Sequence, residues 1–390
     1  MVNSLKVIPV WFDSLGSKSA SVYVKTKDVK VLIDPGSAAL QPGFPLPDSV
    51  KYYYHLRALG SINRFGKLAD VIIITHYHYD HHTPPSFSYF DASKIYGNKL
   101  ILVKDPNAYI NKSQHERARF FMEEMVKFFL NKELDDFLIE PKQKDFEDPI
   151  EWIPEAMSTD FGSYNERRRE VLERGRKWFE NMKKIWSSSK WVKEINEGSL
   201  RIRFADGKEF RFGNTKIRFT KPMFHGIEYD RLGWVIGVVI EDGEEKFLYS
   251  SDIQGPFIED YATWIIDEKP DYLILDGPQT YQLGYMLNVT NFKRALKNVM
   301  RILIETDFKW MIYDHHLLRD IRWEDRIKNV REKARELGKI FLTAAELKGY
   351  KPVASVIKEI KNKGLSDELI SMLRIPKSYY QEVIKYFKKR

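Results

Sequence analysis

Short apolar runs separated by polar turns dominate the first hundred residues. These runs are rich in valine, isoleucine and aromatic side chains, which favour β-strands. They cover residues 5–12, 20–25, 29–33, 71–74 and 100–103. The sequence therefore predicts a sheet in this part of the chain.

The pattern changes to helical spacing between residues 113 and 187. Apolar side chains from Val171 to Trp186 recur along one face of a helix. Residues 113–198 also carry four of the nine tryptophans, beside three consecutive arginines at 167–169. Either the tryptophans are core and the arginines a solvated face, or the segment is a lid that grips substrate. In both cases we predict a helical insertion over residues 113–198.

Strand patterns return after the insertion, at residues 200–204, 209–212, 216–220, 233–241, 245–250 and 272–275. Asp206-Gly207 joins the first two and is typical of a hairpin turn, so we expect these strands in a second sheet. Helical patterns at residues 291–304 and 323–337 flank a further strand at 309–313. Strands alternating with helices indicate a layered α/β fold. Residues 350–390 are mainly helical in pattern, and we expect them to form a small docked appendage.

The composition narrows the class of protein. A chain of 390 residues with 43% hydrophobic and 30% charged residues can bury a large core. No apolar run approaches the ~20 residues needed to cross a bilayer, and the start of the chain lacks a secretory pattern. We therefore predict a cytoplasmic protein without a membrane segment. Because there is no cysteine, any metal must be held by histidine, aspartate or glutamate.

The charge balance adds an expectation about partners. Lys and Arg number 63 against 55 Asp and Glu, which gives a formal charge of +8. A positive protein attracts anions over long distances. We therefore expect a small anionic substrate, with nucleic acid as the alternative partner.

A dense cluster of metal-binding residue types follows the apolar run at residues 71–74. Within six residues the chain offers His76, His78, Asp80 and His81. At this spacing a loop or helix start can direct His76 and His78 to one side of a cleft and Asp80 and His81 to the other. Imidazole and carboxylate ligands in this arrangement suit two adjacent divalent metal ions. The cluster predicts a metal centre at the end of this strand.

The other histidines support the same site. Seven of the nine lie in three places along the chain, at residues 76–82, 225 and 315–316. Only His55 and His115 stand apart, and we interpret these two as ordinary hydrogen-bonded side chains.

In the order of its motifs, the sequence resembles the metallo-β-lactamase superfamily. The residues that match the successive motifs are Asp34; His76, His78, Asp80 and His81; His225; Asp252; and His315 or His316. The resemblance implies a four-layer αβ/βα sandwich with a helical insertion. It divides the chain into a first half (1–112), the insertion (113–198), a second half (199–349) and a helical C-terminal tail (350–390). Segments around Asp13, Asp276 and Asp314 are most similar to an archaeal branch of metal-dependent hydrolases that has no assigned substrate.

The resemblance also implies a dinuclear ligand set. One metal would take His76, His78 and His225, and the other Asp80, His81 and His315, with Asp252 shared by both. We favour His315 over His316 because it comes first after the strand. Zinc is the default for such a site, with manganese or iron as alternatives. The residues expected around these ligands, either orienting them or contacting substrate, are Asp34, His82, Asp276, Asp314 and His316.

The reaction class expected from this site is hydrolysis. A water between two cations loses a proton near neutral pH, and the metal-bridged hydroxide would attack an ester, a lactone or a phosphodiester, with Asp80 as a catalytic residue. The alternative is a nuclease that acts on RNA or DNA through the same site, which the positive charge favours. A scaffold without activity is the third reading. The lack of cysteine disfavours a penicillin-cleaving member, and His78 disfavours the oxygen-reducing di-iron branch, which has a glutamate there.

Overall fold

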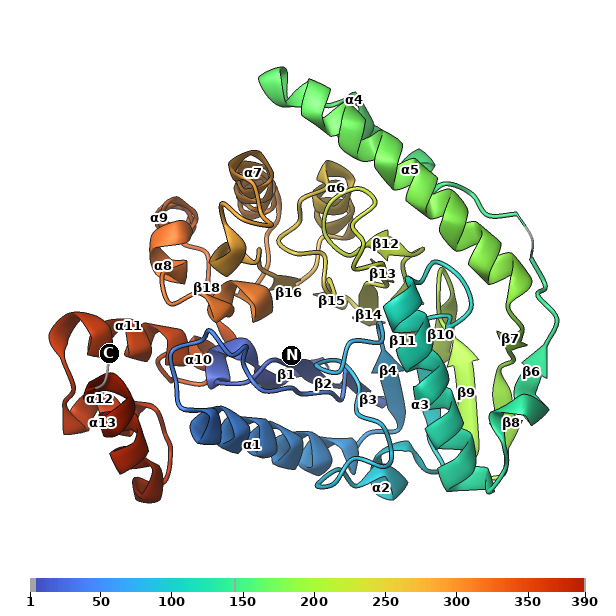
Figure 1. Cartoon of the computed structure of the whole chain (residues 1–390), viewed down its shortest axis with the longest axis horizontal. Helices are drawn as coiled ribbons and strands as arrows, with labels where there is room; N and C mark the ends of the chain where they lie inside the picture. The colour runs from blue at the N-terminus through green and yellow to red at the C-terminus, as the bar shows by residue number, and fades with distance from the viewer. Residues whose placement is uncertain (1–4, 144, 389–390) are drawn as a thin grey trace.

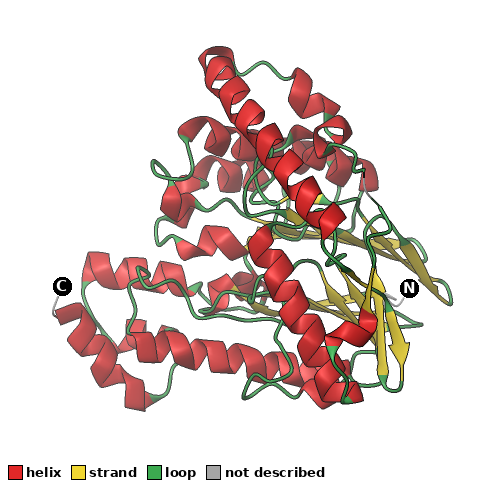
Figure 2. Cartoon of the chain, turned by 45° about the vertical axis from the view of Figure 1, so that its right-hand side comes forward, coloured by secondary structure: helices red, strands yellow, loops and turns green. Residues whose placement is uncertain are grey.

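The computed structural model describes residues 5–143 and 145–388. Two seven-stranded sheets lie face to face in the middle of the molecule, and helices cover their outer faces (Figure 1, Figure 2). The apolar side chains between the sheets come from both of them, including Val22, Val31 and Ile73 from the first and Val238, Ile240 and Ile274 from the second. The predicted α/β sandwich of the metallo-β-lactamase type is confirmed.

The first sheet has the strand order β1-β2-β3-β4-β5-β9-β8. Its strands are β1 (Lys6–Phe12), β2 (Ala20–Lys25), β3 (Lys30–Ile33), β4 (Val71–Ile74), β5 (Leu100–Val103), β8 (Ile195–Glu197) and β9 (Leu200–Phe204). β4 lies in the middle and pairs with parallel strands on both sides. All four of its residues are buried, because a central parallel strand is covered on both faces.

The expectation that residues 200–204 belong to the second sheet was wrong. β9 pairs with β5 in parallel, so it extends the first sheet, and Asp206-Gly207 connects two different sheets instead of closing a hairpin. A parallel neighbour requires a long crossover, and the helical insertion supplies it between β5 and β9.

The second sheet has the order β10-β11-β14-β15-β16-β17-β18. Its strands are β10 (Glu209–Phe212), β11 (Thr215–Phe219), β14 (Val238–Asp242), β15 (Glu245–Tyr249), β16 (Tyr272–Asp276), β17 (Trp310–Asp314) and β18 (Phe341–Leu342). β15 to β18 are parallel. Their carboxyl ends therefore meet at one edge of the sheet, where loops carry functional residues.

Helices on the outer faces complete the layers. α1 (Asp48–Gly66), α2 (Ala92–Tyr96) and α3 (Lys112–Leu130) lie on the side of the first sheet, and α6 (Glu259–Glu268), α7 (Val289–Glu305), α8 (Trp323–Arg326) and α9 (Lys328–Glu336) on the side of the second (Figure 1). No helix of the described part of the chain has both the length and the apolar character that spanning a membrane requires.

The insertion is held on the body by aromatic packing and a buried ion pair. It contains α4 (Pro154–Ser158) and the long helix α5 (Asn165–Ser188). The ring of Trp178 stacks on Trp234 with centroids 5.3 Å apart, which supports the reading of the aromatics as core. Of the three arginines at 167–169, Arg168 is buried and pairs with Glu228 at 2.8 Å, so it does not belong to a solvated face. The boundaries at 112 and 198 stay a prediction.

The C-terminal segment consists of α10 (Ala344–Leu347), α11 (Val353–Lys363), α12 (Asp367–Met372) and α13 (Tyr380–Lys388). It packs beside α1: the Tyr54 hydroxyl donates to the Leu373 carbonyl, and the rings of Tyr53 and Tyr379 lie 5.2 Å apart. The helical pattern predicted for residues 350–390 is confirmed as far as Lys388, and residues 389–390 lie outside the described part.

Candidate metal centre

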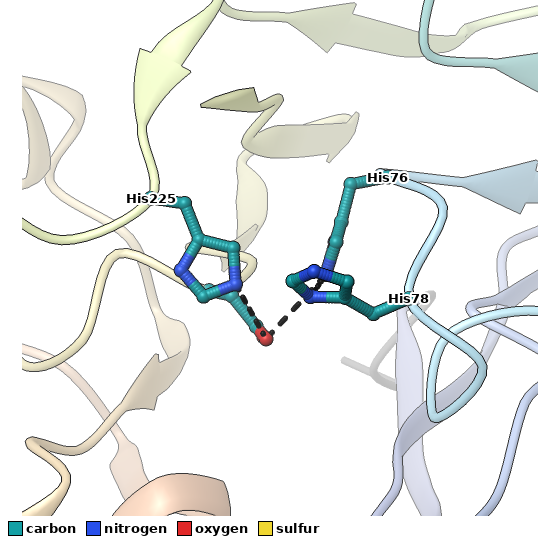
Figure 3. A group of neighbouring side chains, drawn as sticks. His76, His78 and His225 are labelled. Carbon is teal, nitrogen blue, oxygen red and sulfur yellow. Dashed lines mark hydrogen bonds and ion pairs between the residues drawn. The ribbon is translucent and has the colours of Figure 1, made fainter. Parts of the chain in front are cut away.

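The ends of four buried strands bring the predicted side chains together. His76 follows β4, His225 follows the short strand β12 (Met223–Phe224), and Asp252 and His315 follow β15 and β17. Figure 3 shows His76 and His78, which share the loop after β4, turned toward His225 on a separate segment of the chain. Residues that lie up to 239 positions apart in sequence thus share one small volume, because all these strands end at the same side of the molecule.

Asp252 lies at the centre of this cluster. Its Oδ2 is 3.0 Å from His81 Nε2, 3.3 Å from His315 Nε2, 3.4 Å from His225 Nε2 and 3.5 Å from His76 Nε2. The carboxylate is buried. Four imidazoles around one buried carboxylate oxygen form a site that can hold a divalent cation.

The ligand atoms fall into overlapping groups in which all members lie within 4.8 Å of one another: His76, His78, His225 and Asp252; Asp80, His81 and His315; and Asp252, His315 and His316. His78 joins the first group through Nδ1, which is 3.1 Å from His76 Nε2. The structure thus brings together all seven residues that the resemblance implied as ligands, and it adds His316 to their neighbourhood.

Hydrogen bonding within the described chain leaves the central atoms unsatisfied. Both oxygens of Asp252 and Nε2 of His225 are buried and have no hydrogen-bond partner among the described residues. Buried polar atoms without partners are costly, and in a cluster of imidazoles and a carboxylate their lone pairs suit a metal ion. The residues present therefore fit a divalent metal.

Electrostatics divide the ligands into two groups. Burial lowers the pKa of His76 and His78 well below the ordinary value, so both rings are neutral, which is the form that binds metal. Burial would also lower the pKa of His81 and His315, but neighbouring carboxylates outweigh this effect and raise the pKa of His81 to about 10 and that of His315 well above the ordinary value. Burial would raise the pKa of Asp252, but these two rings hold it well below its ordinary value. His81 and His315 must therefore each lose a proton when a metal binds.

Carboxylates hold the rings of two histidines, His81 and His316, on the side away from the cluster. Asp34 Oδ2 accepts from His81 Nδ1 at 2.8 Å, and Asp276 accepts from His316 Nδ1 at 2.9 Å. Each bond turns Nε2 of the ring toward the cluster and sets its tautomer. Asp34 and Asp276 thus occupy the supporting positions that the sequence suggested.

The other two residues expected around the ligands act on the backbone. Asp314 accepts from the amides of His315, at 2.7 Å, and Ala344, at 2.8 Å, and so holds the loop after β17. His82 Nδ1 donates to the His78 carbonyl at 3.0 Å. Neither contacts a ligand ring by a hydrogen bond in the described chain, so they support the shape of the loops.

Sequence reasoning missed two residues with direct contacts to the cluster. Asp13 accepts from His315 Nδ1 at 2.8 Å and from Arg319 Nε at 2.6 Å. The other amino group of Arg319 lies 2.9 Å from Asp80 Oδ2 and 3.2 Å from His315 Nε2. A guanidinium therefore stands beside the Asp80 group. Two signals could have marked Asp13: its position directly after strand β1 and its place in a segment that resembles the archaeal branch.

A cleft of about 490 Å³ opens onto the cluster. His78, Asp80, His225 and His316 line it, whereas His315 does not. Four cationic side chains also line it, namely Lys18, Arg117, Arg231 and Arg319. In the described chain the first three form no ion pair, and Arg319 pairs with Asp13 and Asp80. The carboxylates of Asp80 and Asp230 line the cleft as well, so cationic side chains outnumber carboxylates in its lining by four to two.

The chain is similar to known proteins in sequence and in fold. A family model described as the metallo-beta-lactamase superfamily matches residues 15–82. UPF0282 proteins are similar over most of the chain. The protein from Korarchaeum cryptofilum is 32% identical, and the alignment covers 88% of this chain and 89% of the relative. The protein from Metallosphaera sedula is 31% identical, and the alignment covers 96% of both chains. Among solved structures, the metallo-beta-lactamase fold protein YhfI from Bacillus subtilis is 12% identical, with a TM-score of 0.39 over 87% of this chain and 95% of its own.

Proposed function

We propose that this chain, which belongs to the UPF0282 family of archaeal proteins, is a metal-dependent hydrolase. Its residues 15–82 match the metallo-beta-lactamase superfamily, and its histidine cluster is buried. The observation that carries the proposal is the buried Asp252 carboxylate, which has no hydrogen-bond partner among the described residues and lies among four imidazoles. Such a group is explained by a cation between the rings.

The proposed ligands are His76, His78 and His225 on one side, Asp80, His81 and His315 on the other, and Asp252 between them. Divalent metal ions at these positions, with zinc as the first choice, act as Lewis acids and make a bound water acidic near neutral pH. Two distances support His315 over His316: its Nε2 is 3.3 Å from Asp252 Oδ2, against 3.9 Å for His316.

The charge of the cleft points to an anionic substrate. Lys18, Arg117 and Arg231 line its mouth without ion-pair partners in the described chain, so they can bind and orient an anionic group. Among the reactions expected of this site, a phosphoester fits this mouth better than a neutral ester or lactone. Burial opposes ionisation of Asp80, but His81 and Arg319 outweigh it and keep the pKa well below the ordinary value. The Asp80 carboxylate can then orient the attacking water by a hydrogen bond.

The test is turnover of matched substrates after metal loading. We expect zinc- or manganese-loaded protein to hydrolyse bis-nitrophenyl phosphate faster than nitrophenyl acetate or a lactone, and Asp80→Ala to lower kcat at least ~100-fold. Asp307→Ala is the matched control, because this carboxylate is exposed and its ion-pair partner in the described part of the chain is Lys339. Metal-dependent activity confined to the neutral substrates, or none on any of them, would overturn the proposal.

A nuclease is the second candidate, and the cationic mouth together with the net charge of +8 favours it. Binding of nucleic acid through several phosphates releases counterions, so affinity falls steeply with salt. We expect a nuclease to bind labelled RNA with a steep salt dependence. A hydrolase of small phosphoesters would show weak binding that changes little with strand length.

A further inference from the structure

A second cavity opens beside the metal cleft and has a different character. It encloses about 700 Å³ between α1, α3 and the loops that follow β3 and β4. Five aromatic side chains line it: Tyr52, Tyr79, Phe87, Tyr89 and Phe120. We call this cavity the aromatic pocket. Nothing in the proposed hydrolysis uses it.

The aromatic side chains of this pocket expose apolar surface to water, which is unfavourable in free energy. Their exposed fractions lie between 40% for Phe87 and 65% for Tyr89. Nine large aromatic side chains are exposed in the described chain, and five of them line this one cavity. Apolar surface gathered in this way marks a binding site more often than chance exposure does. The pocket is therefore suited to a flat apolar group that stacks on its walls.

The aromatic pocket is continuous with the metal cleft. Ala38 and Tyr79 line both cavities. The guanidinium of Arg117, which belongs to the cleft, lies 5.0 Å from the centre of the Tyr79 ring. One molecule can therefore place an anionic group in the cleft and an aromatic group in the pocket at the same time.

These observations favour one class of ligand. We propose that the substrate is a nucleotide-type phosphoester whose base occupies the aromatic pocket while its phosphate lies in the cationic cleft. The inference rests on the proposed function for the location of the reacting phosphate, and on the aromatic pocket for the base.

Binding of two matched compounds tests this pocket apart from catalysis. AMP and ribose 5-phosphate carry the same sugar and phosphate and differ in the base. Stacking contributes about 1–3 kcal/mol per base, so titration calorimetry on the metal-loaded full chain should show AMP binding at least about fivefold more tightly. A dinucleotide as a third compound identifies the source of the base: tighter binding than AMP indicates a strand end, and equal binding a free nucleotide.

Two variants locate the effect. Phe120→Ala and Tyr89→Ala remove exposed rings of the pocket and should reduce the advantage of AMP at least threefold, leaving the affinity for ribose 5-phosphate unchanged. Phe128→Ala is the control, because Phe128 lies on the same helix α3, is 53% exposed and does not line the pocket. Equal affinity for AMP and ribose 5-phosphate, or an AMP advantage that survives both variants, would overturn the inference. A base-dependent affinity without turnover of any phosphoester would leave the inference standing and remove the proposed function.

Discussion

Replacing Asp34 by asparagine tests the support beneath the metal centre. This buried carboxylate accepts four hydrogen bonds: from the Thr75 amide at 2.8 Å, the Thr75 hydroxyl at 2.7 Å, His81 Nδ1 at 2.8 Å and the Tyr249 hydroxyl at 2.8 Å. Three of these bonds reach Oδ2. Asp34 also has a positive φ of 49°, a conformation that asparagine tolerates, so the substitution adds little backbone strain.

The expected loss of unfolding free energy follows from the hydrogen bonds that the asparagine side chain cannot accept. The best orientation of the new side chain keeps its oxygen at the Oδ2 position, where it still accepts three bonds. Its NH₂ group then faces the Thr75 amide, and that bond is lost. Because a hydrogen bond to a charged group contributes about 1.5–3 kcal/mol, and the other three bonds weaken when the charge disappears, we expect the free energy of unfolding to fall by about 3 kcal/mol.

Urea denaturation of the metal-free protein measures this loss without a contribution from metal binding. Tyr249→Phe serves as the internal standard, because it removes only one of the four bonds and should cost about 1.5 kcal/mol. With metal present, Asp34→Asn should also weaken zinc binding about 10- to 100-fold, since His81 loses its charged partner. An unfolding free energy within about 0.5 kcal/mol of wild type at an unchanged m-value would refute the role assigned to Asp34.

Three further perturbations address the insertion, the tight loop and the metal stoichiometry. Glu228→Gln should lower the unfolding free energy by about 3 kcal/mol at pH 7, because it leaves the buried Arg168 without a charged partner and removes one of the two carboxylates that pair with Arg294. Burial opposes ionisation of Glu228, but those arginines outweigh it and lower the pKa, so the difference from wild type in urea melts should shrink as pH falls below about 4.5. A Cβ on Gly36 would lie 2.2 Å from the His82 backbone nitrogen, so Gly36→Ala should abolish tight zinc binding in equilibrium dialysis while the far-ultraviolet circular dichroism is retained. Because the Arg319 guanidinium lies beside Asp80, a zinc ion at the Asp80 group meets a positive charge. In competition with a chelating dye, wild type should therefore bind a first zinc at least tenfold more tightly than a second, and Arg319→Ala should reduce this difference. Two zinc sites of equal affinity in wild type would contradict the assignment.

The metal motif could be predicted because its information is local. The ligands from His76 to His81 span six residues, directly after a strand of four buried aliphatic residues. Both features can be recognised in one short stretch of sequence. The ligands His225, Asp252 and His315 carry no such signal alone. They could be predicted through the resemblance to a family, since a single histidine or aspartate at a strand end is common.

Long-range contacts explain what the sequence did not predict. Asp13 and His315 are 302 positions apart in sequence. They become partners because the carboxyl ends of β1 and β17 lie close together in the folded sandwich. Helix α1 was missed because its nineteen residues mix buried Val50 and Ile62 with many polar side chains, which weakens the helical periodicity. The strand at 200–204 was assigned to the wrong sheet because strand periodicity identifies a strand and not its neighbour.

The two sides of the metal centre differ in the partners behind their rings. His81 and His315 donate from Nδ1 to the carboxylates of Asp34 and Asp13. The Nδ1 of His225 instead lies 3.2 Å from Nε2 of the neutral Gln254 amide, which must turn its oxygen to this ring for His225 Nε2 to bind a metal. A carboxylate partner makes an imidazole a more basic ligand and reduces the electrophilicity of its metal, and a neutral partner does so less. A metal held by His225 and its neighbours would therefore be the stronger Lewis acid. That metal also faces the cleft, which His225 lines and His315 does not, so the more electrophilic position lies where a substrate can reach it.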